Sequence, residues 1–327
     1  MLEPSWIGMR ITVRRVVGRR PEGRIVLADV VGYLVELDAH HAVLEARDGR
    51  VELDVNHITL ARLAPPSIRD ELALEAIAAR GWRAEQTSEL GGWLLRANAG
   101  FTGRANSVLP LGSPGRPLAD ALDAARIWYA ARELPLMFQV PVHARRLLDS
   151  ELAERGWRAS PDVHVMAARL QTLIAADAAG LRDHPRPIAE VIDHPEDAWF
   201  ARYRDGASAS RAARGLLTRH ETAGFACVRL DAGHGARVVA VGRGTVDEHW
   251  LGVTAVEVEP GMRRRGLAQA VMRALWAWGI DRGAVRSHLE VSVDNEPATA
   301  LYRRLGYWVH HDYHYRLDPP HGTDPSN

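Results

Sequence analysis

The sequence predicts an α/β protein with a mixed sheet, formed by a small β-barrel and two related α/β units. Three observations lead to this prediction. Short strand patterns separated by turn residues fill residues 1–64. From Ser67 onward, helix and strand patterns alternate, which is typical of an α/β sheet. A helix, a glycine–aromatic pair and a strand follow one another repeatedly, which indicates a divergent internal duplication.

Residues 1–64 are expected to form the small barrel, and Pro65–Pro66 marks its end. Asp48-Gly49 is the clearest hairpin signal. The spacing of the short strands resembles SH3-like or Tudor-like domains, in shape alone. Two uses remain open, namely binding a peptide or nucleic acid and docking onto the rest of the chain. Strands are expected at Arg10–Val17, Ala28–Asp38, Ala42–Glu45 and Val51–Asp54.

The first α/β unit is expected at residues 67–172, with a linker near residues 175–187. Gly81 and Gly156 follow two helical patterns, and a glycine directly after the last helical residue commonly ends a helix. Helices are predicted at Ile68–Arg80, Pro117–Arg132 and Ala144–Arg155, and strands at Gly92–Ala97, Leu136–Val140 and Val163–Leu170.

The second α/β unit is expected at residues 185–318, followed by a disordered tail at residues 319–327. Apolar, β-branched runs bounded by turn residues predict its strands, and amphipathic spacing predicts its helices. The strands are predicted at Ile188–Ile192, Phe225–Leu230, Ala236–Val246, His249–Val258, His288–Val293 and Trp308–Leu317. The helices are predicted at Glu196–Asp205, Ala207–Leu217, Gly266–Asp281 and Pro297–Leu305.

Composition excludes several classes of function. The 41 basic residues balance 41 acidic ones, so the chain is not a strongly basic nucleic-acid coat, and we do not expect nucleic acid as a partner. All the basic residues are arginine, which excludes a Walker A loop and a Schiff-base lysine. Cys227 is the single cysteine, so an internal disulfide is impossible. With no signal or membrane-spanning pattern, a soluble cytoplasmic protein is expected.

A strand–turn–helix between residues 251 and 275 predicts an anion-binding site. The strand ends at Val258, Pro260-Gly261 turns the chain, and the helix begins near Gly266. Backbone N–H groups of such a turn point into a concavity, and the helix N-terminus adds about half a positive charge. A pyrophosphate group fits this kind of site.

Residues 263–268 have the form Arg-x-x-Gly-x-Ala, and residues 295–307 have the form Asn-x-x-Ala-x-x-Leu-Tyr-x-x-Leu-Gly-Tyr. These two motifs, in this order, closely resemble the GNAT (Gcn5-related) acyltransferase superfamily across residues 185–318. The resemblance implies a GNAT fold, acetyl-CoA as the acyl donor and no metal.

The resemblance also implies roles for individual residues. The strand Val256, Glu257 and Val258 pairs with the pantetheine arm as an added strand would. The side chain of Asn295 bonds the same arm, and Tyr302 protonates the departing CoA thiolate. The pyrophosphate is held by Arg263, Arg264, Arg265, Gly266, Leu267 and Ala268.

The general base is predicted to be Glu290, twelve residues before Tyr302. This spacing resembles that of the ribosomal-protein N-terminal alanine acetyltransferases, where the glutamate is a proposed base. A solvated strand glutamate is the alternative interpretation of Glu290. Glu257 and Glu259 are lesser candidates, and the place of an earlier strand glutamate in other members is taken here by Gly252.

Two further segments have less specific patterns. Strand alternation places His310 and His314 on one face and His311 on the other, and a substrate role is favoured over metal binding. The polar, Gly-rich segment at residues 100–108 is interpreted as a turn, with a substrate loop as the alternative.

The first α/β unit resembles a degenerate GNAT half. Two prolines within Gly112–Pro117 remove N–H donors from the turn that would hold an anion. Spacing places Pro141 and Leu148 where the asparagine and tyrosine would recur.

The function predicted from the sequence is acyl-CoA-dependent N-acyl transfer, most directly acetyl transfer to a protein or small-molecule amine in a ternary complex. The layout resembles an actinobacterial group with an N-terminal SH3-like domain described as histone-acetyltransferase-like. The alternatives are a small-molecule acyltransferase of the tandem-GNAT mycothiol synthase type and a non-catalytic acyl-CoA-binding regulator. A homodimer and a monomer remain equally open.

Overall fold

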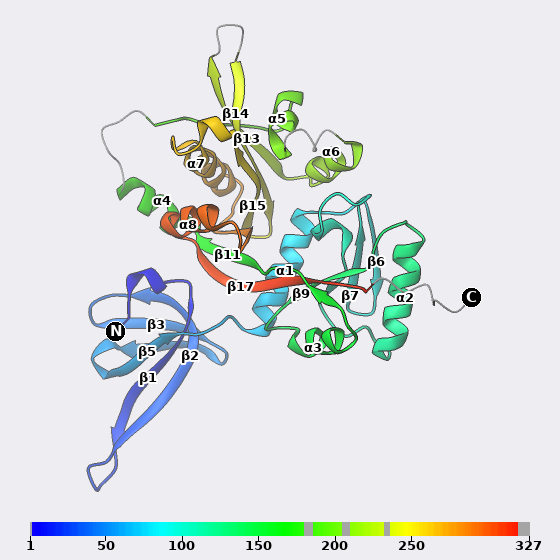
Figure 1. Ribbon diagram of the computed structural model, residues 1–327. Coiled ribbons are helices and arrows are strands. Elements are labelled where there is room, and N and C mark those ends of the chain that lie inside the picture. Colours follow the sequence, from blue (N-terminus) through cyan, green and yellow to red (C-terminus); the bar gives the residue numbers. More distant parts are fainter. Residues whose placement is uncertain (1, 180–185, 205–209, 232–235, 320–327) are drawn as a thin grey trace. The chain divides into compact units, whose positions relative to one another are not determined.

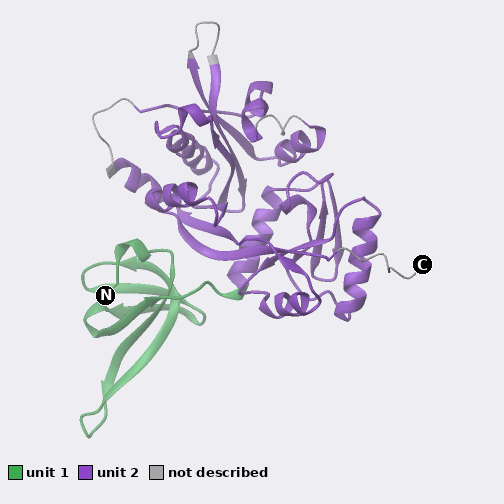
Figure 2. Cartoon of the chain, viewed as in Figure 1, with its two compact units in different colours: residues 1–68 green, residues 69–327 purple. Residues whose placement is uncertain are grey.

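The computed structural model describes residues 2–179, 186–204, 210–231 and 236–319 (Figure 1). The chain divides into two compact units, residues 1–68 and residues 69–327 (Figure 2). None of the helices in the described ranges is long and apolar enough to cross a membrane.

The first unit is a five-stranded antiparallel sheet in the order β4-β3-β2-β1-β5. Alternate side chains from neighbouring strands, among them Ile11, Leu34 and Leu44, are fully buried and form its core. The predicted strands are confirmed, but no described pairing joins β4 to β5, so a closed barrel stays a prediction. Its elements are η1 (Pro4–Trp6), β1 (Arg10–Arg19), β2 (Ile25–Leu37), β3 (His41–Ala46), β4 (Gly49–Asp54), η2 (Val55–His57) and β5 (Ile58–Leu63).

The second unit contains two α/β lobes, which we call the N-lobe (residues 69–179) and the C-lobe (residues 186–319). Helices and strands alternate in the N-lobe as predicted, and the strands β6, β8 and β10 and the helix α4 are additional. Helix α4 occupies the start of the predicted linker, whose residues 180–185 lie outside the described ranges. The N-lobe contains α1 (Ile68–Gly81), β6 (Gln86–Leu90), β7 (Trp93–Ala97), η3 (Arg104–Asn106), β8 (Leu109–Pro110), α2 (Leu118–Ala130), β9 (Met137–Pro141), α3 (Arg146–Glu154), β10 (Arg158–Ala159), β11 (Val163–Arg169) and α4 (Leu170–Ala179).

Every strand and helix predicted for the C-lobe is present, with shifted ends. The helix predicted from Ala207 begins at Arg211, and residues 205–209 lie outside the described ranges, as does the predicted tail from residue 320. The C-lobe contains β12 (Glu190–Ile192), α5 (Asp197–Arg202), α6 (Arg211–Thr218), β13 (Ala223–Asp231), β14 (Ala236–Asp247), β15 (Trp250–Val258), η5 (Pro260–Met262), α7 (Leu267–Ile280), β16 (Arg286–Ser292), α8 (Glu296–Leu305) and β17 (Trp308–Leu317).

The two lobes share strands. The large mixed sheet runs β10-β17-β11-β16-β15-β14-β13-β12, so the N-lobe strand β11 lies between the C-lobe strands β16 and β17. Strand β17 in turn crosses to the N-lobe, where its second half pairs with β9 and β10 (Figure 1). The large sheet is therefore incomplete in either lobe alone, whereas a second, three-stranded sheet, β6-β7-β8, lies wholly within the N-lobe.

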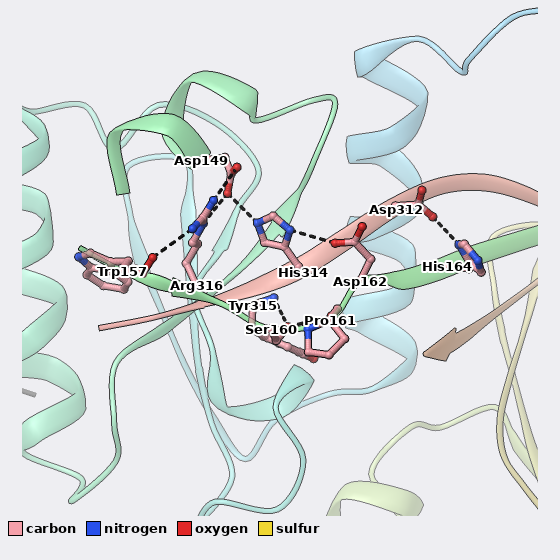
Figure 3. Close-up of polar contacts among 10 residues, drawn as sticks. All are labelled: Asp149, Trp157, Ser160, Pro161, Asp162, His164, Asp312, His314, Tyr315 and Arg316. Carbon is pink, nitrogen blue, oxygen red and sulfur yellow. Dashed lines mark hydrogen bonds and ion pairs between the residues drawn. The ribbon is translucent and has the colours of Figure 1, made fainter. Parts of the chain in front are cut away.

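Polar contacts fix the second half of β17 against the N-lobe (Figure 3). The ring of His314 lies between Asp149 on α3, at 2.6 Å, and Asp162, at 3.1 Å. The guanidinium of Arg316 donates to both carboxylate oxygens of Asp149 at 2.7 and 2.9 Å. Burial raises the pKa of Asp149, but the hydrogen bonds and charges of Arg316 and His314 outweigh it and lower that pKa. These charged hydrogen bonds hold the second half of β17, the strand that crosses between the lobes, on the N-lobe.

The alternation predicted for the β17 histidines is wrong, because the register against β11 shifts at His310. The bulge brings the Nδ1 atoms of His310 and His311 to 2.8 Å, and His311 Nε2 lies 2.9 Å from a carboxylate oxygen of Glu75. Within the described residues, no group of histidine, cysteine and acidic side chains is arranged to hold a metal ion. His310 and His311 thus contribute to a polar network between β17 and α1, to which His314 does not belong.

Helices α3 and α8 end in the same way. Each is followed by a glycine of positive φ (81° and 105°), and the next, aromatic residue donates its N–H to the carbonyl five residues earlier. These bonds run from Trp157 to Leu152 at 3.1 Å and from Tyr307 to Tyr302 at 3.0 Å. Such a C-terminal motif fixes the equivalence of the two helices residue by residue.

By this equivalence, Leu152 and Arg145 of the N-lobe occupy the positions of the α8 tyrosine and asparagine. Arg145 is the N-cap of α3, as the asparagine is the N-cap of α8. The equivalence predicted from spacing, Pro141 and Leu148, is wrong because the strand-to-helix connections differ. The conclusion is unaffected, since the N-lobe has neither an asparagine nor a tyrosine at these positions.

Candidate active site

The centre of the C-lobe sheet is split. Strands β15 and β16 pair in parallel only from Trp250 to Val253, and the last pair is Val253 with Leu289. Directly afterwards β15 has a bulge against β14, where Ala255 has a φ of 54°. Beyond Val253 the side of β15 that faces β16 has no strand partner among the described pairings. An extended chain could therefore add to this edge.

A cavity of ≈ 1020 Å³ opens at this split. Tyr302 also lines the cavity, whereas Arg265 and Glu290 do not. The structure thus brings together nine of the residues predicted to hold the acyl donor, in a space large enough for a sizeable ligand. Those nine are Val256, Glu257, Val258, Arg263, Arg264, Gly266, Leu267, Ala268 and Asn295. Further residues that line the cavity are Gln269, Pro297, Ala298, Ala300, Leu301 and Arg304, of which Ala298 and Leu301 belong to the motif at residues 295–307.

One wall of the cavity is the turn before α7. Gly266 is the N-cap of α7 and has a φ of 76°, and Arg264 also has a positive φ, of 62°. Left-handed residues in such a turn direct successive N–H groups inward, and the helix N-terminus adds its partial positive charge. The Nε atom of Arg263 donates to the carbonyl of Val258 at 3.4 Å. This wall has the geometry and the charge to hold a phosphate group.

Replacing Gly266 with valine is expected to weaken acetyl-CoA binding at least tenfold. A β-branched residue at this positive φ is strained by about 1–2 kcal/mol, and the turn must move to relieve the strain. Titration calorimetry and urea unfolding measure the two effects. The matched control is Gly261→Ala in the same turn, where an added Cβ meets nothing within 4 Å and φ is not positive. Unchanged affinity of Gly266→Val for acetyl-CoA would show that the turn does not contribute to binding.

The opposite wall is the N-terminal part of α8. The side-chain oxygen of Asn295 accepts the N–H of Ala298 at 3.3 Å and so caps the helix. About two helical turns after Asn295, Tyr302 is 8% exposed and packs edge to face on Tyr307. Burial raises the pKa of Tyr302 to about 12, so its hydroxyl keeps its proton at neutral pH. It is therefore available as a proton donor facing the cavity.

The side chain of Glu290 lies on the face of the sheet opposite the one that packs against α7. Its neighbours Leu289 and Val291 pack into the core with α7, whereas the carboxylate of Glu290 points toward the N-lobe. It lies 2.8 Å from Nη1 of Arg104 and accepts the Tyr313 hydroxyl at 2.6 Å. Its side chain is 4% exposed, so the interpretation as a solvated strand glutamate is wrong. Burial alone raises the pKa of Glu290, but the charge of Arg104 and the two hydrogen bonds outweigh it and lower the pKa.

The lesser candidates for the base are less well placed. Glu257 lines the cavity, and its carboxylate accepts the backbone N–H of Arg204 at 2.8 Å. Glu259 forms an ion pair with Arg237 at 2.7 Å. Cys227 is buried, and burial raises the pKa of its thiol to about 12, which makes it unreactive.

Sequence reasoning missed His288 and Arg104. The His288 ring covers Gly252, since a Cβ added to that glycine would lie 2.8 Å from Nε2. Its Nδ1 is buried without a partner within the described chain, and burial lowers its pKa to about 4. Arg104 belongs to the Gly-rich segment interpreted as a turn. That segment does contain a short 3₁₀ turn, but the arginine in it contacts Glu290, which only the fold could show.

The N-lobe has a corresponding split that is filled. Its strands meet in parallel at Val108 and Phe138, as β15 and β16 do in the C-lobe. Just beyond that bridge, the guanidinium of Arg145 donates to the carbonyls of Pro110 and Leu111. The strand edge that is open in the C-lobe is therefore occupied by a side chain in the N-lobe.

The fold and the split define the class of protein, a GNAT-type acyltransferase. The solved structure of a GCN5-related N-acetyltransferase from Kribbella flavida matches with a TM-score of 0.58 and 20% identity, over 76% of this chain and 95% of that one. The family model described as "Probable histone acetyltransferase Rv0428c C-terminal" matches residues 67–316, and the chain belongs to this family.

Two relatives agree with this assignment. The "Probable histone acetyltransferase Rv0428c" of Mycobacterium tuberculosis is 30% identical over 324 residues, which cover 95% of this chain and 96% of the relative. The "Uncharacterized N-acetyltransferase YobR" of Bacillus subtilis is 27% identical over 246 residues, 75% of this chain and 97% of the relative. The protein is an N-acetyltransferase of the GNAT superfamily.

Proposed function

We propose that the protein transfers the acetyl group of acetyl-CoA to an amine by direct attack in a ternary complex. The observation that carries the proposal is the cavity at the strand split. It combines an open strand edge, an anion-binding turn before α7 and a protonated Tyr302 on one surface. These are the three features that recognition of an acyl-CoA thioester and departure of its thiolate require.

Each part of the cavity has a role in this proposal. The turn at residues 263–268 binds the pyrophosphate, and the open edge at residues 256–258 pairs with the pantetheine arm. Backbone N–H groups near Val258 polarise the thioester carbonyl. The amine attacks the carbonyl carbon and loses its proton to Glu290, directly or through water. Tyr302 gives its proton to the CoA thiolate as the carbon–sulfur bond breaks.

We propose that the C-lobe alone binds acetyl-CoA. In the N-lobe, Arg145 covers the equivalent strand edge and Leu152 has no proton to give. One acetyl-CoA per chain is therefore expected by titration calorimetry. A stoichiometry of two would contradict this assignment.

The acceptor is proposed to be an amine of a protein or of a small molecule. The name of the mycobacterial relative favours a protein acceptor. The sheet formed by β1 to β5 also favours it, since a separate module beside a transferase suits docking of a large substrate. Cys227 is the single cysteine of the sequence and is buried as a free thiol, which fits a reducing compartment such as the cytoplasm.

The test is release of CoA from acetyl-CoA by the purified protein. Acceptors would be simple amines, lysine peptides and peptides with free N-termini, with product mass measured in parallel. The chain contains no lysine, so acetylation of its own side-chain amines cannot contribute to the signal. Turnover on one acceptor class would establish the transferase and name the class. Tight acetyl-CoA binding without turnover on any amine would instead favour a regulator that senses acyl-CoA.

A further inference from the structure

We propose that Arg104, which belongs to the N-lobe, is a positioning residue for the reaction catalysed in the C-lobe. Its guanidinium holds the Glu290 carboxylate in place beside the strand split. The lobe whose own split is filled thereby completes the active site of the other. This inference rests on the proposed role of Glu290 as the base.

The first step in the argument is that Arg104 is itself held firmly. It belongs to the short 3₁₀ turn η3, and its guanidinium lies 4.8 Å above the ring of Trp82. That ring is 2% exposed, and its Nε1 donates to the hydroxyl of Thr102 at 3.0 Å. An arginine that stacks on a fixed aromatic ring loses little further freedom when it binds a carboxylate. Arg104 is thus held in advance by a fixed aromatic ring of its own lobe.

The second step is that side chains from two elements, η3 and β17, hold the Glu290 carboxylate in place. Arg104 contacts one carboxylate oxygen at 2.8 Å, and Tyr313 on β17 donates to the other at 2.6 Å. Each carboxylate oxygen has two lone pairs, so both can still accept a further proton or hydrogen bond. Glu290 follows Leu289, the last β16 residue paired with β15. The backbone of Glu290 therefore lies just beyond the last β15–β16 pair, where the split begins.

The third step concerns charge. Burial of Glu290 favours the protonated carboxyl, which cannot accept a proton from an amine. The titratable groups that face it are Arg104 from the N-lobe, Tyr313 and Tyr315 from β17, and His288 from β16 itself. His288 is neutral at physiological pH because burial lowers its pKa to about 4. Arg104 is thus the largest of the influences that favour the ionised carboxylate.

The experiment compares kcat/KM against pH for the full chain and for Arg104→Gln, with the acceptor found in the CoA-release screen. At pH 7 the variant should lose about 10- to 100-fold in kcat, while the KM for acetyl-CoA stays within about twofold. The acid limb of the profile is its low-pH side, where activity rises with pH as Glu290 loses its proton. Without the cation, burial raises the pKa of Glu290, so this acid limb should move to higher pH. A purely structural residue would lower activity without moving that limb.

Three further variants make the result decisive. Arg104→Lys keeps the charge and should retain the wild-type acid limb. Glu290→Gln should lose activity, and adding Arg104→Gln to it should cost nothing more, because the two residues act as one unit. Arg132→Gln is the matched control, because Arg132 stacks on Trp128 at 3.7 Å in the same lobe and donates to Gln86 and to the Trp128 carbonyl.

An unmoved acid limb in a folded Arg104→Gln protein overturns the inference. If that variant does not fold, Arg104→Lys decides, and an acid limb shifted in spite of the retained charge overturns it. Full activity of Glu290→Gln overturns the inference but leaves the transferase intact. Absence of turnover by the wild-type protein on every amine overturns the proposed function itself.

Discussion

Residues 186–319, produced as a separate fragment, are expected to remain unfolded or to aggregate. The fragment lacks β11, the strand that joins β16 to β17 in the large sheet. Strand β11 pairs with β16 from Val163 to Arg169 and with β17 from Val163 to Ala167. Its loss exposes two apolar strand edges and opens the core around Leu289 and Val291. No local repair is available, because nothing else in the fragment can fill the gap between those strands.

Circular dichroism and urea unfolding would test this expectation. The fragment should show no cooperative transition, whereas co-production with residues 67–179 should give a soluble complex, since each part supplies strands to the other. The control is the chain without residues 1–66, which removes one compact unit and should leave the second unit folded. A monomeric, cooperatively folded fragment 186–319 would show that β11 can be dispensed with.

Tyr302→Phe is expected to lower kcat by about 100- to 10,000-fold, the usual contribution of a positioned proton donor. The substitution removes one hydroxyl and keeps the ring that packs on Tyr307 and lines the cavity. Acetyl-CoA should therefore bind with its wild-type affinity. Stability should change little, because the Tyr302 hydroxyl makes no hydrogen bond within the described residues. Steady-state CoA release and titration calorimetry separate the two effects.

The neighbouring tyrosine provides the control for this prediction. The hydroxyl of Tyr307 lies 3.0 Å from Nε1 of Trp276 and 2.7 Å from the hydroxyl of Ser287, and all three side chains are buried. Tyr307→Phe should therefore lower stability by about 1–3 kcal/mol, through unpaired buried groups, with kcat nearly unchanged. Wild-type turnover in Tyr302→Phe would require another proton donor to the leaving thiolate.

Much of the C-lobe could be predicted because its decisive signals are local in sequence. The turn before α7 needs a left-handed residue, and Gly266 is visible as a glycine at a strand–helix junction. The end of α8 also needs a left-handed residue, and Gly306 followed by an aromatic residue can be recognised in the sequence in the same way. Motifs of this kind fix a loop and a helix end at once, so the cavity formed between them follows from the sequence.

The remaining features depend on contacts between distant segments. Nothing in the pattern of residues 163–169 shows that this strand inserts between β16 and β17, because any apolar strand has two edges to offer. The contact of Arg104 with Glu290 joins positions far apart in the chain, so a charged residue in a Gly-rich loop was interpreted as part of a turn. The bulge at His310 likewise depends on the partner strand and not on its own sequence.

The exchange of strands also governs how the protein is made. During synthesis, the N-lobe emerges first. Its strands β9 and β10 lack their partner β17 until that strand is made, and β11 likewise lacks β16 and β17. The large sheet cannot be completed until the last strand, β17, leaves the ribosome. The nascent chain therefore exposes unpaired strand edges during most of its translation. We expect chaperones to bind it until β17 has been made. Premature termination anywhere before Trp308 would remove β17 and leave the large sheet incomplete in both lobes.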